Sequence, residues 1–362
     1  MIISKDTSLV IKGIAILCMF IHHAIPWPER IPLSSELHNY VASNNDFIWY
    51  GYLGRICIPL FMFVTGVGMG FFKNFSLSGI WSRALHVCAK FYQIYLFSLI
   101  IGTILLYNFP IDYMAFDLSL HGFVQALLLC NPSYICLEWW YTSVFLALIL
   151  FVFPIFSFLQ RFFGKTAIAL ILLISCYLSF LAIYDTNQLP AWISGNYQIM
   201  LIFLPVFSLG YAIGACNLQY LNKVIEIIRK KIIIRLGLLF TVSILSYEFI
   251  ISNIFSPDLL VMLNVLTCAV VFMTILLVQK DSICCKILSF LGKYSAYMWL
   301  NHSFILYYYF RDIIYSTNSF VIVITVTTLL SLIIAVISDR ILNALVGTLR
   351  KTYQKWKLLM IK

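Results

Sequence analysis

The chain has 362 residues, of which 62% are hydrophobic and only 10% are charged. Because an ordinary soluble domain is nearer one quarter charged, this composition excludes a soluble globular protein and indicates a polytopic membrane protein. The formal net charge of +10 is therefore read from its distribution along the chain, and we expect no nucleic-acid partner.

Apolar segments long enough to cross a bilayer recur along the whole chain. Each crossing helix needs about 20 apolar residues. We therefore expect an all-α integral membrane protein with about ten transmembrane helices in one bundle, at 8–26, 50–72, 84–107, 138–159, 166–184, 197–216, 232–251, 258–279, 289–310 and 320–341. The apolar segment from His121 to Cys130 is too short to cross, which predicts an interfacial or re-entrant helix on the outer side.

Positive charges orient this bundle. If the N-terminus is cytoplasmic, nineteen of the 24 lysines and arginines fall in cytoplasmic loops or in the C-terminal tail, and only Arg30 and Arg311 fall outside. The positive-inside rule then places both termini in the cytoplasm. We expect residues 1–345 to form the transmembrane domain and residues 346–362 a basic cytoplasmic tail.

The first apolar segment carries a cation at one end and two imidazoles at the other, in the sequence KGIAILCMFIHH. Lys12 interrupts the segment and no small-residue cleavage site follows, so we expect a retained helix and not a signal peptide. The spacing places Lys12 and His23 on nearly the same helix face, about 16 Å apart along the axis, whereas His22 points elsewhere. Ionisable groups inside a membrane helix normally mark a functional site. The alternative is that Lys12 snorkels to the interface and the histidines end the helix.

The second and third segments add further cations. Arg55 stands at the outer end of the second segment, where a buried guanidinium needs a carboxylate or a substrate oxygen as partner. The small residues that follow it predict close helix packing: Thr65, Gly66, Gly68 and Gly70. Arg83, His86 and Lys90 share one stripe at the start of the third segment, which suits either phosphate groups or ordinary headgroup contacts.

Two later segments contain polar residues among aromatic ones. Glu138, followed by Trp140 and Tyr141, opens the fourth segment. The aromatic residues fit an interface belt, and Glu138 could pair with a cation across the bundle. His302 in the ninth segment stands between Asn301 and Ser303, so a hydrogen-bonded structural histidine is an equal alternative to a catalytic one.

The ten cysteines are scattered through apolar stretches without a C-x-x-C pair. This distribution fits small buried hydrophobic residues better than a metal site, and we expect no metal. Cys130 and Cys136 lie close together in an expected outer loop, where they could form a disulfide.

The order of these pieces resembles the membrane acyltransferase 3 family, which includes bacterial surface-polysaccharide O-acetyltransferases. The resemblance covers about residues 5–340 and is carried by IKGIAILCMFIHH, IPLFMFVTG, LEWWYTSVF, GNYQIMLIFLPVFSLGYAIG and LGKYSAYMWLNH. By the family's spacing Lys12 takes the place of an arginine, which keeps the charge but loses bidentate geometry, and His23 takes that of a histidine. We expect no fused extracytoplasmic hydrolase-like domain after the tenth span.

The resemblance implies a multi-pass protein of the cell inner membrane that moves an acyl group, usually acetyl, from cytoplasmic acetyl-CoA. The implied acceptor is a hydroxyl of a lipid-linked or surface polysaccharide. His23 is the expected base or transient acyl acceptor, and His22 is its alternative. Lys12, Arg83 and Lys90 would hold coenzyme A phosphates or stabilise the oxyanion. Further candidates for donor or acceptor binding are Arg55, Glu138, Trp140, Tyr141 and His302.

Two other classes of protein fit part of this pattern. A transporter or flippase for a glycan or another anionic solute would use the same intramembrane charges for binding or proton coupling. No internal repeat is visible to favour it, and no G-x-x-x-x-G-K-[ST] loop indicates ATP-driven transport. A non-catalytic membrane partner in polysaccharide export would tolerate replacement of His23 without loss of product.

Overall fold

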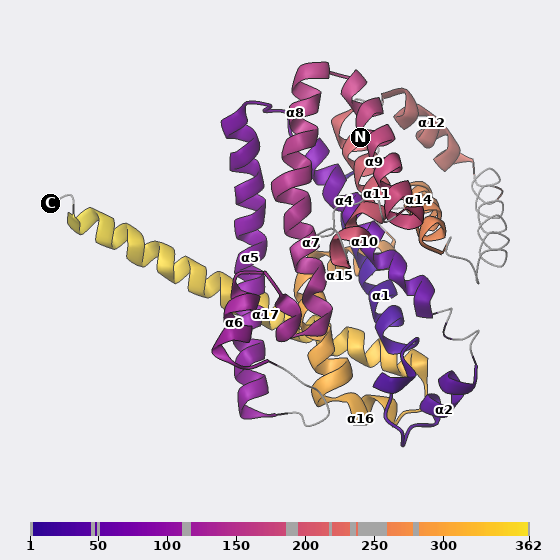
Figure 1. Ribbon diagram of the computed structural model, residues 1–362, viewed down its shortest axis with the longest axis vertical. Helices are drawn as coiled ribbons and strands as arrows, with labels where there is room; N and C mark the ends of the chain where they lie inside the picture. Colours follow the sequence, from indigo (N-terminus) through magenta and orange to yellow (C-terminus); the bar gives the residue numbers. More distant parts are fainter. Residues whose placement is uncertain are drawn as a thin grey trace.

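The computed structural model describes residues 3–44, 48, 51–110, 117–185, 195–216, 219–231, 237, 259–277 and 282–360. Within these ranges the chain is helical and contains no strand, which confirms the expected all-α class. Most helices run lengthwise through the molecule, with the N-terminus in one half and the short helices Glu36–Ser43 and Arg311–Tyr315 at the opposite end (Figure 1).

Six helices are long and apolar enough to cross a membrane, and each coincides with an expected segment. They are Lys5–Ala24 (α1), Gly51–Gly70 (which includes α4, Cys57–Gly70), Leu77–Asn108 (α5), Leu137–Phe163 (which includes α7, Tyr141–Ala147, and α8, Phe153–Phe163), Thr166–Tyr184 (α9) and Phe320–Gln354 (within α17, Phe320–Met360). The bent pair α10 (Asn196–Ile202) and α11 (Leu204–Ala215) would make a seventh span.

The expected count of ten spans is not confirmed. Only the Leu263–Leu277 part of α14 (Leu259–Leu277) is counted as a shorter apolar helix. The helix α15 (Ile283–Ser303) carries two lysines, an asparagine and a histidine, which lower its hydropathy. Apart from Gly237, the expected span 232–251 lies outside the described residues. The side of the membrane on which each terminus lies stays a prediction.

Prolines account for two breaks in the helices. Pro205 in the first turn of α11 has no backbone N–H to continue α10, and the two helices meet at 51°. One turn before Pro59, the backbone tightens into a 3₁₀ turn, Gly54–Ile56 (η2). Because that turn immediately precedes α4, it places Arg55 at the outer end of the helix, as expected.

Glycines bring two pairs of helices into backbone contact. Gly66 and Gly70 of α4 face Gly210 and Gly214 of α11, and a Cβ at any of these four positions would overlap the partner backbone. Gly68, in contrast, has nothing within 4 Å of the place its Cβ would take. Gly66 and Gly70 therefore serve close packing, as predicted, whereas Gly68 does not.

The helices α1 and α15 make the second such contact. A Cβ on Gly13 would overlap the carbonyl oxygen of Leu288, and one on Gly292 would overlap that of Leu9. This contact fixes the separation and the register of the two helices that contribute the histidines of the molecule's interior.

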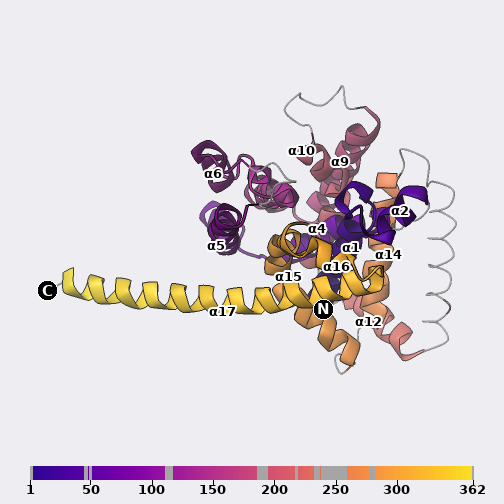
Figure 2. The ribbon, with the colours of Figure 1, turned by 90° about the horizontal axis from the view of Figure 1, so that it is seen from below.

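The C-terminal helix α17 is continuous from Phe320 to Met360. Its first half packs along one buried stripe, Val323, Thr327, Ser331 and Ala335. Its second half leaves the body of the molecule, and the basic segment that begins at residue 346 continues the helix (Figures 1 and 2).

Short helices cover the expected outer end. The predicted interfacial segment forms α6 (Leu120–Leu127), in the same half of the molecule as α2 (Glu36–Ser43) and α16 (Arg311–Tyr315) (Figure 1). Ser35 ties α2 to this end, since its Oγ lies 3.0 Å from the Tyr315 carbonyl oxygen and 3.0 Å from Asn318 Oδ1.

Candidate active site

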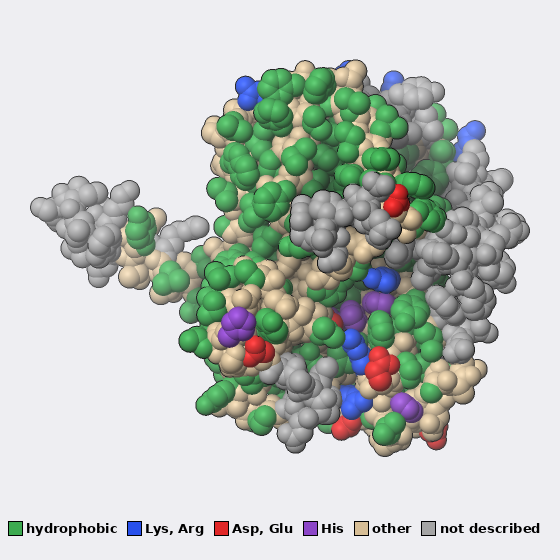
Figure 3. All heavy atoms as spheres, viewed as in Figure 1, with side chains coloured by type: hydrophobic (Ala, Val, Ile, Leu, Met, Phe, Trp, Pro, Cys, Tyr) green, Lys and Arg blue, Asp and Glu red, His purple; other side chains and the backbone are tan. Residues whose placement is uncertain are grey.

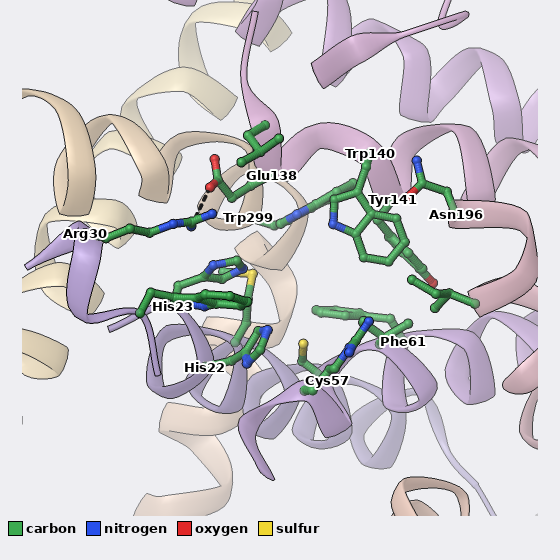
Figure 4. Close-up of a pocket in the computed structure, with 16 residues that line it drawn as sticks. His22, His23, Arg30, Cys57, Phe61, Glu138, Trp140, Tyr141, Asn196 and Trp299 are labelled. Carbon is green, nitrogen blue, oxygen red and sulfur yellow. Dashed lines mark hydrogen bonds and ion pairs between the residues drawn. The ribbon is translucent and has the colours of Figure 1, made fainter. Parts of the chain in front are cut away.

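A cavity of about 240 Å³ lies where the C-terminal end of α1 meets α4, α7, α10 and α15. Its walls are Met19, His22, His23, Trp27, Arg30, Arg55, Cys57, Ile58, Phe61, Leu137, Glu138, Trp140, Tyr141, Asn196, Ile199 and Trp299. Figure 4 shows their side chains arranged around one open space. On the face seen in Figure 3, histidine and charged side chains gather in the lower half among hydrophobic ones.

Two consecutive histidines at the end of α1 form one wall. His22 is 8% exposed, and its Nδ1 lies 3.3 Å from the carbonyl oxygen of Gly51, to which it donates. The ring centroids of His22 and His23 are 5.1 Å apart. Close approach of the second segment here depends on Gly54, because a Cβ there would overlap the Cys18 carbonyl oxygen.

His23 contacts aromatic residues of α15 and of the π-helix that follows it, Phe304–Tyr309 (η7). The Tyr307 hydroxyl lies 3.1 Å from His23 Nδ1 and donates to the His23 carbonyl oxygen at 2.5 Å. The His302 ring lies 4.8 Å from that of His23, centroid to centroid and tilted by 47°, but His302 does not line the cavity. Its Nδ1 donates to the Trp299 carbonyl oxygen at 2.6 Å, as the structural alternative requires.

The three neighbouring imidazoles raise the question of a metal. In the described part of the chain, no group of three or more His, Cys, Asp or Glu side chains is arranged to hold an ion.

A buried ion pair forms part of the cavity wall. Arg30 Nη1 lies 2.8 Å from Glu138 Oε1, and the two side chains are 18% and 2% exposed. This contact confirms that Glu138 pairs with a cation across the bundle. The same carboxylate accepts from the Tyr308 hydroxyl and the Cys136 thiol, both at 3.5 Å. Arg30 comes from the short helix Pro28–Arg30 (η1), so the segment that follows α1 contributes to the cavity wall and is more than a connector.

Aromatic rings and hydrogen-bond donors form the rest of the wall. Tyr141 packs edge to face on Trp299 at 5.4 Å. The Tyr141 hydroxyl and the Trp27 Nε1 are buried without a hydrogen-bond partner among the described residues. Arg55 likewise has no hydrogen bond or ion pair with any residue in the described ranges. These groups are free to bind a ligand that carries acceptor oxygens.

The remaining predicted residues lie elsewhere. Lys12 is half-buried on α1 and does not line the cavity. Arg83 is half-buried near the start of α5, where its Nε lacks a partner among the described residues, whereas His86 and Lys90 are exposed on that helix. The structure therefore groups His22, His23, Arg55, Glu138, Trp140 and Tyr141, and it leaves Lys12, Arg83 and Lys90 outside that group.

Sequence reasoning missed several residues of this site. Trp27 and Arg30 stand in a loop whose residues read mostly as connectors, and Tyr307 stands in a run of three tyrosines with no helical or charge pattern of its own. The pair Cys130 and Cys136 carries free thiols, the first exposed and the second buried beside Glu138, so the disulfide considered for this loop is not formed.

Comparison with known proteins agrees with the resemblance read from the motifs. The family model described as an acyltransferase domain, that of the acyltransferase 3 family, matches residues 10–340. No curated protein matches the chain. No solved structure matches it either.

Proposed function

We propose, starting from the fact that the chain belongs to the acyltransferase 3 family, that it is a membrane O-acyltransferase for a cell-envelope glycan. From the cell inner membrane it would move an acetyl group from cytoplasmic acetyl-CoA to a hydroxyl of a sugar in a lipid-linked or surface polysaccharide. The observation that carries the proposal is the cavity itself, in which His22 and His23 face aromatic rings and donors that have no partner among the described residues.

His23 is the group that the direct reaction needs. A sugar hydroxyl is a poor nucleophile at neutral pH, and a positioned imidazole can take its proton as the C–O bond forms. The hydroxyl oxygen attacks the thioester carbonyl carbon, and collapse of the tetrahedral intermediate breaks the C–S bond. The coenzyme A thiolate then leaves and recovers the proton from the imidazolium.

A covalent route uses the same side chain. An imidazole nitrogen of His23 would take the acetyl group from the thioester and pass it to the sugar hydroxyl in a second step. Both routes require one unprotonated ring nitrogen directed at the reacting carbonyl, and both are lost when His23 is removed.

The hydrogen-bond donors that have no partner among the described residues would stabilise the negative charge that develops in either route. Arg55, the Tyr141 hydroxyl and the Trp27 indole N–H would donate to the oxyanion or to sugar oxygens, in a site that protein already shields from water. Trp140 and Trp299 supply flat apolar walls against which the carbon face of a sugar ring can pack.

Binding of the acyl donor, acetyl-CoA, is assigned to the cations nearer the expected cytoplasmic end. Lys12, Arg83 and Lys90 would contact the phosphates of coenzyme A. Lys12 is on the same helix as His23, three turns away, so the thioester must extend about 16 Å from the phosphate contact to the imidazole.

The test uses protein purified into nanodiscs and radiolabelled acetyl-CoA, with His23→Ala and His22→Ala beside the wild type. We expect wild type to release coenzyme A and to label an envelope-glycan extract, and His23→Ala to lower the transfer rate by about 10²–10⁴-fold. Loss in His22→Ala alone would keep the function and change the residue. A folded wild type that neither releases coenzyme A nor labels several glycan extracts would contradict the proposal, and glycan transport assays in vesicles would then test the transporter.

A further inference from the structure

The Tyr307 hydroxyl touches His23 at two points. It lies 2.5 Å from the His23 backbone carbonyl oxygen and 3.1 Å from the imidazole Nδ1. Among the described residues, no other group forms a hydrogen bond with the His23 ring. Tyr307 therefore controls which ring nitrogen carries the proton.

Proton counting decides the tautomer. A phenol has one hydrogen to donate and lone pairs with which to accept. The carbonyl oxygen can only accept, so the Tyr307 hydrogen goes to it, and the phenol oxygen can meet Nδ1 only as an acceptor. The Nδ1 must then carry the hydrogen, which leaves Nε2 of the neutral imidazole unprotonated.

We propose that Tyr307 is a positioning residue that holds His23 as the Nδ1–H tautomer and presents Nε2 to the cavity. This inference rests on the proposed function, in which a ring nitrogen of His23 removes the acceptor proton or takes the acyl group. Whichever route operates, Nε2 is the reacting atom. A hydrogen bond to the far nitrogen of a catalytic histidine also fixes the orientation of its ring.

The surroundings of Tyr307 hold the phenol in place. The side chain is 1% exposed. The Arg30 guanidinium lies 4.7 Å from the centre of its ring, and Arg30 is itself fixed by its ion pair with Glu138. Tyr307 belongs to the π-helix η7, a geometry that recurs at functional sites because its extra residue re-aims side chains.

His302 does not compete for this role. Its Nδ1 donates to the Trp299 carbonyl oxygen at 2.6 Å, and its Nε2 lies 3.4 Å from the Ser303 hydroxyl. Both ring nitrogens of His302 are thus engaged within its own helix, and its contact with His23 is between tilted rings, 4.8 Å apart and at 47°.

The chain offers a matched control one residue along α1. The Tyr315 hydroxyl donates to the Ala24 carbonyl oxygen at 3.0 Å and is as deeply buried as Tyr307. Tyr307→Phe and Tyr315→Phe each remove one buried hydroxyl that bonds to the last turn of α1, but only the first removes a contact with an imidazole.

The experiment compares steady-state acetyl transfer by wild type, Tyr307→Phe and Tyr315→Phe in nanodiscs. We expect Tyr307→Phe to lower kcat by about 10- to 100-fold with the KM for acetyl-CoA unchanged, and Tyr315→Phe to keep kcat within about threefold. In parallel, ¹⁵N NMR of histidine-labelled protein, assigned with His23→Ala, reports the tautomer directly. We expect a protonated Nδ1 at His23 in wild type and a mixture of tautomers in Tyr307→Phe.

Three results would overturn the inference: wild-type kcat in Tyr307→Phe, an equal loss of kcat in Tyr315→Phe, or a protonated Nε2 at His23 in wild type. If Tyr307→Phe does not fold, the wild-type spectrum still decides the tautomer. A wild type that transfers nothing would contradict the proposed function, whereas an active wild type with a protonated Nε2 would contradict the positioning role alone.

Discussion

The helices α1 and α15 contact each other in two places, one through their backbones and the other through side chains. Near the expected cytoplasmic end, Gly13 and Gly292 let the backbones touch, and almost no side chain intervenes. Near the expected outer end the contact is made by side chains, as the His23 ring lies against that of His302 and hydrogen-bonds to Tyr307 just beyond α15. The backbone contact fixes distance and register, and the side-chain contact uses that register to align hydrogen bonds.

The α4–α11 pair shows what a backbone contact does without a polar counterpart. Four glycines bring the helices together, and apolar side chains fill the remainder of the contact. No predicted catalytic residue lies along this contact. Close packing alone therefore builds the scaffold. The site arises at the α1–α15 pair, where the close backbone contact is followed along the helices by the polar side chains His23, His302 and Tyr307.

The largest effect, a loss of stability, is expected from breaking the ion pair between Arg30 and Glu138. Glu138→Gln leaves the Arg30 guanidinium without its counter-charge, and loss of one partner of a buried pair costs about 3 kcal/mol or more. Thermal unfolding in detergent should show the loss, together with a lower rate of acyl transfer.

The double variant Arg30→Met with Glu138→Met sharpens this test. Replacement of both charges by apolar groups should recover part of the stability but none of the activity, because Tyr307 would lose the guanidinium above its ring. Full recovery of activity would show that the pair is not needed to position the site.

A smaller effect is expected at the backbone contact. Gly292→Ala forces α1 away from α15 and should cost about 1–3 kcal/mol, the usual range for overpacking. Because the same shift moves His23 from Tyr307, acyl transfer should fall as well. Unfolding curves and initial rates measure the two effects.

Gly68→Ala is the matched control for that variant. It also replaces a helical glycine, but its Cβ enters open space. We expect unchanged activity, since alanine suits a helix better than glycine. Equal destabilisation by both variants would refute the assignment of Gly292 to a close helix contact.

The smallest effect tests which part of the chain meets the acyl donor. Lys12→Gln should raise the KM for acetyl-CoA about tenfold, equivalent to about 1.4 kcal/mol, and leave the unfolding temperature unchanged. Lys90→Gln, at an exposed site on α5 where water screens the charge, should raise the KM for acetyl-CoA by a smaller factor, about threefold. The opposite order would move the donor site from α1 to the surface of α5.

Local patterns in the chain were enough to predict much of this protein. Hydropathy and length located the six helices that are long and apolar enough to cross a membrane, because a bilayer-crossing segment is recognised from its own residues. The spacing of Lys12 and His23, with four further motifs in order, predicted the family and one residue of the site. The sequence allowed Glu138 to pair with a cation across the bundle, although nothing indicated which one.

Tertiary structure alone decided how the site is assembled. Arg30 meets Glu138 across 108 residues of sequence, and Tyr307 meets His23 across 284. Neither partner carries a local pattern, since a tyrosine in a run of three reads as an interface aromatic and an arginine in a loop reads as solvated. Their pairing depends on the register of α1 against α15, which is set by the contacts of Gly13 and Gly292. A glycine in the sequence does not indicate which helix it will contact. The nitrogen that His23 presents to the cavity follows from a distance between atoms, and only the folded chain defines it.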